Sequence, residues 1–231
     1  MTERMTERMT VLTSEPMTAA RREILDAAAQ CFMEQGFHAT SVDVVARRMG
    51  ATKGRVYHHY PSKIDLFFDV HRLGMDLLFR AVEPACLVPG DPLQVLAAMM
   101  KAHALAMFEH HAFESVVVQG VQLHRYGALT PRQRTELDAL IASRDQFEGL
   151  FKKQATAAAQ AGLFGDIDVS IAVKTLLGGL QWSLVWYRPD IDNSLEARER
   201  LAEVMVKTLV LGVATRHRGT PRKPRLDKGA A

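Results

Sequence analysis

Residues 40–63 read TSVDVVARRMGATKGRVYHHYPSK, and this stretch predicts two short helices joined by a tight turn. The first half carries apolar residues at the spacing i, i+3, i+4 and i+7, which puts them on one helical face: Val42, Val45, Ala46 and Met49. Gly50 can end that helix because glycine adopts left-handed backbone angles at little cost. Pro61 ends the second helix, since the residue before a proline resists helical angles. Two short helices around a turn that contains glycine form the pattern of a helix-turn-helix.

The outward face of the second helix is expected to be polar and basic. Its residues are Lys53, Gly54, Arg55, Tyr57 and His58. Thr40 and Ser41 are N-cap candidates for the first helix, and Thr52 is the candidate for the second. The stretch holds five basic side chains and one acidic one, whereas the whole chain has a net charge of only +3. In a helix-turn-helix, the first residues of the second helix meet base edges in the major groove of DNA. The local positive charge therefore indicates a DNA-binding surface, with an ordinary solvated helical hairpin as the alternative.

Residues 22–66 resemble the DNA-binding domain of TetR-family transcriptional regulators. The matching positions, all in register, are Ile24-Leu25, Ala28, Phe32, Gly36-Phe37, Thr40-Ser41, Val45-Ala46, Gly50, Lys53-Gly54, Tyr57, His59-Tyr60, Ser62-Lys63 and Leu66. Two positions depart from the family pattern. Tyr60 stands where the family usually has phenylalanine, and Arg55 stands where it usually has a small hydroxyl residue. The second departure concerns the base sequence that is read rather than the mode of binding.

The resemblance implies a sequence-specific regulator that binds double-stranded DNA. The residues expected to contact DNA are Thr40, Ser41, Thr52, Lys53, Gly54, Arg55, Tyr57, His58, His59 and Lys63. Of these, Lys53, Arg55 and Tyr57 are expected to face the major groove. Thr40, His59 and Lys63 are expected to hold phosphates, both by resemblance and because they stand at helix ends. The competing hypothesis is a helical small-molecule-binding or enzymatic protein in which the basic hairpin is incidental.

Composition and length favour a soluble protein of the cell interior. The chain has 231 residues, of which 48% are hydrophobic and 24% charged, as in ordinary globular proteins. Its two cysteines support neither a disulfide framework nor a cysteine-rich metal site. The most apolar stretch, residues 171–186, is interrupted by Lys174 and Gln181, so no membrane span of roughly 18 residues is expected. The N-terminus lacks a basic region followed by an apolar one, and we therefore expect a cytoplasmic protein.

Helical periodicity continues along the chain, and no alternating stretch indicates a sheet, so we expect an all-α protein of about nine helices. Beyond the helix-turn-helix, helices are expected at 18–35, 62–82, from residue 92 onward, and at 131–162, 168–187 and 194–216. Residues 18–64 would form the DNA-binding domain and residues 65–216 a ligand-binding and dimerisation domain. Residues 1–17, with their MTER repeat, and the basic tail 217–231 are expected to be disordered. Arg21 and Arg22 oppose the dipole of the first helix, for which phosphate contact and solvent exposure are the two explanations.

The segment LLGGLQWSLVWYRPD, residues 176–190, indicates a ligand-binding or packing surface. Gly178 and Gly179 cost about 1 kcal/mol each within a helix, which suggests close approach by another helix or by a ligand. Trp182 and Trp186 are four residues apart and share one face, which would be a packed core, a subunit interface or a ligand wall. Together with Arg144 and the Gly-Leu-Phe at 162–164, the segment resembles a TetR subgroup that includes regulators of fatty-acid and sterol-side-chain degradation, which respond to acyl-CoA thioesters.

That second resemblance implies a bulky, partly apolar anion as effector, with an acyl-CoA thioester as the first choice. The pocket is expected between the Met-rich helix near 99–113, the long helix that carries Arg144, and the tryptophan face. Its expected lining is Met100, Met107, Phe108, Phe147, Trp182 and Trp186, with Arg125, Arg144 and Arg188 available for forked hydrogen bonds to the anion.

No pattern indicates an enzyme, a cofactor or a metal. His103, His110 and Glu114 share one helical face, but no HExxH or GxSxG motif is present, so no catalytic residue and no metal ligand is assigned. Instead, a two-fold homodimer built on helices 168–187 and 194–216 is expected. One short recognition helix buries too little surface for specific binding, and symmetric dimers that bind palindromic operators overcome this limit.

Overall fold

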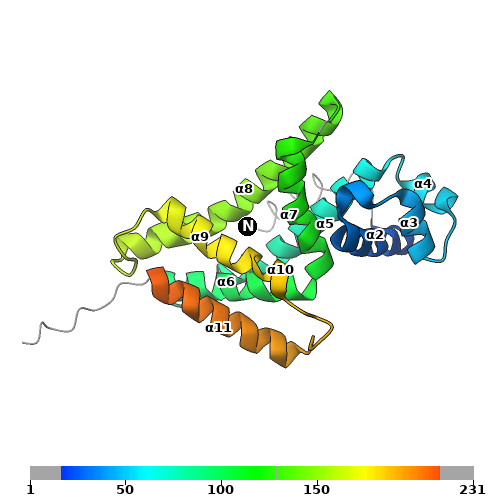
Figure 1. Cartoon of the computed structure of the whole chain (residues 1–231). Helices are drawn as coiled ribbons and strands as arrows, with labels where there is room; N and C mark the ends of the chain where they lie inside the picture. Colours follow the sequence, from blue (N-terminus) through cyan, green and yellow to red (C-terminus); the bar gives the residue numbers. More distant parts are fainter. Residues whose placement is uncertain (1–16, 128, 214–231) are drawn as a thin grey trace, which may run out of the picture.

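The computed structural model describes residues 17–127 and 129–213, and over these residues the protein is all-α (Figure 1). Ten helical segments follow one another along the described chain. Segments α9 and α10 are one helix interrupted at Trp182, so the described residues form nine helices, the number expected from the sequence. Their bounds are α2 Ala19–Ala39, α3 Val42–Arg48, α4 Lys53–His59, α5 Lys63–Ala85, α6 Pro92–Glu109, α7 His111–Tyr126, α8 Pro131–Gln160, α9 Val169–Gln181, α10 Ser183–Trp186 and α11 Leu195–Val213. The predictions for residues 1–16 and 214–231 lie outside the described residues.

Local sequence features begin most helices where they were expected, but α2 runs past residue 35 to Ala39, and α5 runs past residue 82 to Ala85 with Pro84 inside it. Gly36, with a φ of 76°, kinks α2 near its end, and Gly50, with a φ of 63°, follows α3. Ser41 caps α3 by accepting a hydrogen bond from the Val44 amide. Asp91 and Thr130 open α6 and α8 with reciprocal capping boxes. Thr52 stands at the N-cap of α4, but its side chain makes no capping hydrogen bond.

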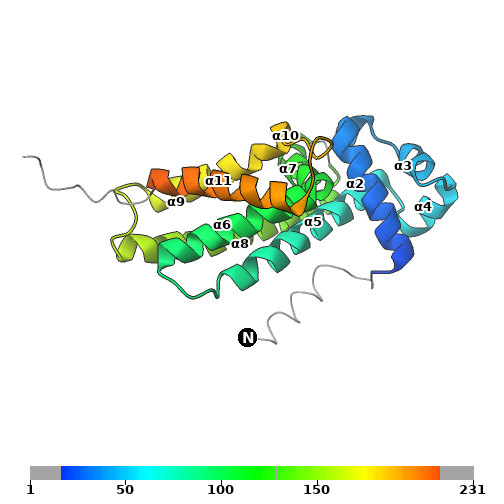
Figure 2. The same ribbon diagram turned by 90° about the horizontal axis from the view of Figure 1, so that it is seen from below.

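Helices α2, α3 and α4 form a small unit at one end of the molecule, and α5–α11 form the longer bundle (Figures 1 and 2). The connection between them is α5, which packs against α2 as well as against α6, α7 and α8. Helix α11 lies along α6 and α9 on the outside of the bundle (Figure 2). Helix α5 therefore touches both the helix-turn-helix and the interior of the bundle.

Two clusters of buried apolar residues form the core. The first of them crosses residue 64, the expected boundary between the two domains. The first contains the interior of α2–α4, but it also takes in Phe67 and Phe68 of α5, Phe113 of α7 and Leu137 of α8. The second fills the rest of the bundle between α5, α6, α8, α9 and α11. Because the first cluster crosses from the helix-turn-helix into α7 and α8, motion of these helices is coupled to the helix-turn-helix by direct packing.

The expected helix at 168–187 is broken in the structure. Helix α9 ends at Gln181, and the short α10 resumes at Ser183. Gly178 and Gly179, which precede the break, have different surroundings. A Cβ on Gly179 would lie 2.8 Å from Cδ2 of Leu209, so this glycine allows α11 to approach α9 closely, whereas a Cβ on Gly178 would meet no atom within 4 Å.

Among the described residues, Val169–Trp186 is long and apolar enough to span a membrane by length and composition. However, this stretch is interrupted at Trp182, and α9 packs against α8 and α11. We therefore assign it to the helical bundle.

Candidate DNA-binding surface and ligand cavity

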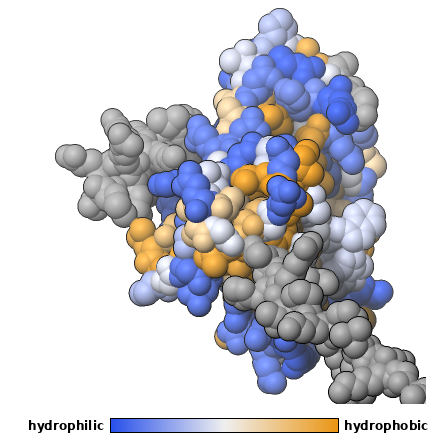
Figure 3. All heavy atoms as spheres, turned by 90° about the vertical axis from the view of Figure 1, so that its left-hand side faces the viewer, coloured by the Kyte–Doolittle hydropathy of each residue, from blue (hydrophilic) through white to orange (hydrophobic). Residues whose placement is uncertain are grey.

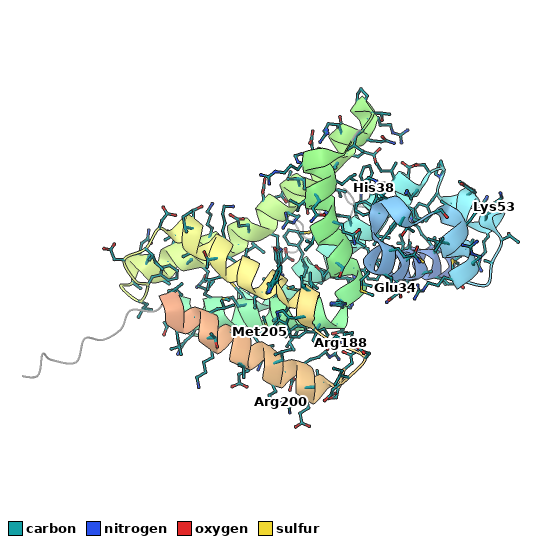
Figure 4. All side chains as sticks on the ribbon, in the orientation of Figure 1. Glu34, His38, Lys53, Arg188, Arg200 and Met205 are labelled. Atoms are coloured by element: carbon teal, nitrogen blue, oxygen red, sulfur yellow. The ribbon has the colours of Figure 1, made fainter. Side chains whose placement is uncertain are left out.

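The helix-turn-helix buries one face of each short helix and exposes the other. Val45, Ala46 and Val56 are in the core, whereas Lys53, Arg55 and Tyr57 are exposed on α4. Lys53 extends from the end of the molecule that lies farthest from the bundle (Figure 4). Gly54, His58, Ser41 and Thr52 are exposed on the same unit, and His59 is half-buried.

Two arginines of this unit are paired with carboxylates of α2. The guanidinium of Arg55 lies 2.5 Å from Glu23, and Arg48 forms a two-pronged bridge to Glu34 with distances of 2.6 and 2.7 Å. The hydrogen bonds from Arg48 lower the pKa of Glu34. Helix α2 thus offsets part of the positive charge counted from the sequence, and its carboxylates hold both guanidinium groups beside the exposed face of α3 and α4.

Lys63 and Thr40 are tied into the fold at the end of α2. The Lys63 ammonium donates to the carbonyls of Phe37, at 2.7 Å, and His38, at 3.2 Å, and it lies 4.5 Å from the centre of the Phe37 ring. Burial lowers the pKa of this ammonium. Thr40 is only 1% exposed, and its hydroxyl lies 2.8 Å from the Gly36 carbonyl. The expected phosphate contact by the Thr40 side chain is therefore corrected, because its hydroxyl faces the interior.

Arg21 is also an internal residue, which corrects the suggestion that it contacts phosphate or solvent. Its Nε donates to the Tyr60 hydroxyl at 3.0 Å, and a terminal nitrogen pairs with Asp69 of α5. Although burial acts in the opposite direction, the bonds to Asp69 and Tyr60 raise the pKa of Arg21. Asp69 also pairs with Arg72, which reaches Glu136 of α8 at 3.3 Å. This buried network links α2, the end of α4, α5 and α8, and it gives the hydroxyl of Tyr60 a function that phenylalanine could not supply.

A cavity of about 270 Å³ opens between α5, α6, α7, α8 and α9. Its lining residues are Met75, Leu78, His103, Val117, Arg144, Asp145, Phe147, Glu148, Lys174, Leu177, Gly178 and Gln181. Apolar side chains and a few polar groups around one concave space are typical of small-molecule sites. Two residues expected at the effector, Arg144 and Phe147, belong to this lining.

The other residues expected at the effector lie elsewhere. Met100, Met107 and Phe108 are fully buried in the core and do not line the cavity. Trp182 and Trp186 are 63% and 44% exposed, so their rings lie on the surface and do not line the cavity. Arg125 is exposed on α7, and Arg188 pairs with Asp190 beside the connection between α10 and α11 (Figure 4). These placements correct the expected lining.

His103 is the main cavity residue that the sequence did not assign to the effector. It faces the rings of Phe147 and Phe151, with centres 5.1 and 5.8 Å away, and its Nδ1 has no hydrogen-bond partner in the described structure. Burial, together with the nearby charge of Arg144, lowers the pKa of His103 to about 3. The sequence placed His103, His110 and Glu114 on one helical face, but α6 ends at Glu109 and α7 begins at His111, so His103 and Glu114 belong to different helices. The described residues contain no group of three or more His, Cys, Asp or Glu that could hold one.

Comparison with known proteins identifies both parts of the chain. The family model for bacterial regulatory proteins of the tetR family matches residues 24–70, and the model for a tetracyclin repressor-like C-terminal domain matches residues 89–213. The transcriptional repressor KstR2 of Mycobacterium tuberculosis is 28% identical over 182 residues, which cover 75% of this chain and 84% of KstR2.

Solved structures give the same result. The TetR-family regulator PfmR of Thermus thermophilus superimposes with a TM-score of 0.68 and 31% identity, covering 81% of this chain and 97% of PfmR. AibR, solved in complex with isovaleryl coenzyme A and operator DNA, superimposes with a TM-score of 0.66 and 27% identity, covering 83% of this chain and 98% of AibR. With an exposed basic α4 in the first unit and a cavity-bearing bundle behind it, the chain belongs to the TetR family of bacterial transcriptional regulators.

Proposed function

We propose that the protein is a cytoplasmic, ligand-responsive repressor that binds a palindromic operator as a homodimer and leaves it when a small molecule fills the cavity. The observation that carries the proposal is the position of α5, which touches both the basic helix-turn-helix and the cavity. Residues 18–64 would serve DNA binding, and residues 65–216 would serve ligand binding and dimerisation. To release DNA, the ligand must bind the DNA-incompetent state more tightly, since equal affinity for both states shifts nothing.

The proposal is tested by selecting genomic fragments on the purified protein at physiological salt and confirming the retained sequences by gel shift. A repressor of this type retains fragments that share an inverted repeat. The competing hypothesis, a helical enzyme or binding protein with an incidental basic hairpin, predicts no retained sequence.

The proposed effector is a partly apolar organic anion, a class that includes acyl-CoA thioesters and free carboxylic acids. Support comes from Arg144 in a cavity that combines apolar and polar side chains and from the isovaleryl coenzyme A in the AibR complex. The test is operator release in a gel shift with acyl-CoAs, free fatty acids and coenzyme A alone. Release by a cationic drug and by no anion would overturn this effector class and leave the repressor proposal standing.

Arg55 is proposed to read bases from α4. Replacing Arg55 with alanine is expected to cost about 1–3 kcal/mol of discrimination at particular base pairs, because a guanidinium can donate two hydrogen bonds to guanine. Competition gel shifts with single-base operator variants measure this loss. Glu23→Gln is the comparison variant: it removes the carboxylate that holds Arg55, so it should keep the base preference and strengthen binding to all DNA. Equal losses on operator and random DNA for Arg55→Ala would exclude base reading.

Lys63 is proposed to contact a phosphate in addition to holding the end of α2. Its ammonium has three donors, of which two engage the Phe37 and His38 carbonyls. Lys63→Ala should weaken operator and random DNA alike and reduce the salt dependence of binding by about one phosphate contact. Binding measured at several salt concentrations gives this slope, and the melting temperature measures the lost carbonyl contacts. A lower melting temperature with an unchanged slope would assign Lys63 to the fold alone.

The proposed dimer surface is the apolar side of α9, α10 and α11. Its large exposed residues are Ile171, Trp182, Val185, Trp186, Val204 and Leu211. Apolar surface is visible at the end of the bundle where α9 begins and α11 ends (Figure 3). An isolated chain would leave these side chains in water, and clusters of this kind mark interfaces.

A further inference from the structure

The cavity contains a half-buried positive charge, Arg144, that no side chain in the described residues pairs with. Arg144 lines it from α8, and it makes no hydrogen bond or ion pair with any residue that the structure describes. Burial lowers the pKa of its guanidinium, although nearby carboxylates act in the opposite direction. A guanidinium withdrawn from water is costly unless an anion meets it, so this residue weakens the empty protein.

The neighbouring acidic side chains do not supply that anion. Glu148 accepts two hydrogen bonds of 2.9 Å from Lys174 and lies 3.5 Å from Lys152, so it is already compensated. Asp145 also lines the cavity and acts on Arg144 through its charge, but it is exposed to solvent and makes no hydrogen bond or ion pair with that guanidinium. Glu114 of α7 is buried, and burial raises its pKa well above the ordinary value although Arg144 acts in the opposite direction, so burial disfavours its charged form.

His103 adds a second unsatisfied group to the same cavity. Its side chain is 1% exposed, and its Nδ1 has no partner. The ring is neutral at physiological pH, so one of its two nitrogens carries a hydrogen to donate. Buried polar atoms without partners are rare in folded proteins, and those of His103 and Glu114 lie around one arginine. Arg144 and His103 thus face the same cavity without a hydrogen-bonding anion between them, although Asp145 and Glu148 also belong to the lining.

We propose that the effector is a small carboxylic acid whose carboxylate is bound by the Arg144 guanidinium and the His103 imidazole, with its hydrocarbon part against Met75, Leu78 and Leu177. A carboxylate has two oxygens that accept hydrogen bonds, and its geometry matches the fork of an arginine. The inference rests on the proposed function and narrows its effector from partly apolar organic anions to free carboxylic acids.

Two features favour the free acid over the thioester. The thioester carbonyl of an acyl-CoA is uncharged, and its phosphates lie far from the acyl group, whereas the charge of a free acid lies directly at the end of its hydrocarbon chain. The cavity of about 270 Å³ also lies below the roughly 300–1,000 Å³ of pockets that enclose drug-sized ligands, so coenzyme A would remain outside.

The test uses the purified full-length chain without DNA. Straight-chain carboxylates of four to ten carbons, together with the alcohol and the coenzyme A thioester of each, are titrated by calorimetry and by thermal shift. At least one carboxylate is expected to bind ten times or more tightly than its alcohol and its thioester. Failure of every carboxylate to bind, or tighter binding of the thioesters, overturns the inference.

Variants locate the binding group. Arg144→Met should weaken carboxylate binding tenfold or more, while the melting temperature of the empty protein stays the same or rises because an uncompensated charge is removed. His103→Phe keeps the ring and should weaken binding to a smaller degree. Arg132→Met on the same helix, exposed and paired with Glu136, is the matched control and should bind as the natural protein does. Unchanged carboxylate affinity in Arg144→Met contradicts the inference.

The result is separable from the proposed function. A chain that binds carboxylates through Arg144 but retains no operator would uphold this site and overturn the repressor. A chain that retains an operator but fails these titrations would do the reverse.

Discussion

Replacing Asp69 with alanine is expected to lower the free energy of unfolding by about 3–5 kcal/mol, because it removes the carboxylate with which the buried Arg21 guanidinium pairs. Asp69 pairs with Arg21 of α2 and with Arg72, so its loss affects the contact between the helix-turn-helix and α5. Urea denaturation measures the change, provided that the slope of the transition is unchanged.

Two comparison variants make that prediction specific. Tyr60→Phe removes only the hydroxyl that accepts from Arg21, and it should cost about 1 kcal/mol. The double variant Arg21→Met/Asp69→Leu replaces both charges with apolar groups and should recover most of the stability lost in Asp69→Ala. A loss below about 1 kcal/mol in Asp69→Ala would mean that water reaches the pair and that the network does not hold the helix-turn-helix on α5.

Placing a charge on the proposed dimer surface is expected to abolish specific DNA binding. Val185 of α10 is 67% exposed in the single chain, and Val185→Glu would bury two carboxylates in a symmetric interface. The chain should become a monomer, and operator affinity should fall by about 1,000-fold, since specific binding exceeds nonspecific binding by at least that factor. Light scattering gives the mass, and a gel shift gives the affinity.

Val121→Glu provides the matched control, because it makes the same substitution at an exposed position of α7, outside the proposed interface. This variant should remain dimeric and bind the operator normally. If Val185→Glu stayed dimeric, the interface would lie elsewhere; if it were monomeric and still bound the palindrome tightly, dimerisation would not be needed for recognition.

The sequence by itself determined the fold class, the helix-turn-helix and the family. These features depend on residues that are close along the chain. Ser41 caps α3 through an amide three residues away, and the left-handed angles of Gly36 and Gly50 end or kink a helix at the residue itself. Apolar spacing then defines which face of each helix is buried, so the exposed side of α4 could be identified from its residues alone.

Tertiary structure decided which partner each polar side chain meets. Arg21 and Asp69 are 48 residues apart, and only folding shows that a basic residue at a helix start is buried against α5. Lys63 meets the carbonyls of Phe37 and His38 for the same reason. Periodicity assigns a residue to a face, but the partner depends on which helix covers that face.

Which residues line the cavity also depends on the tertiary structure. Met100 and Met107 have the composition of a ligand wall, yet they pack in the core, whereas Met75 and Leu78 of α5 line the cavity. Core and cavity use the same apolar residues, so composition cannot separate them. Gly178 lines the cavity with Arg144, whereas Gly179 meets Leu209 of α11, a contact between residues 30 apart in the chain that no local pattern encodes.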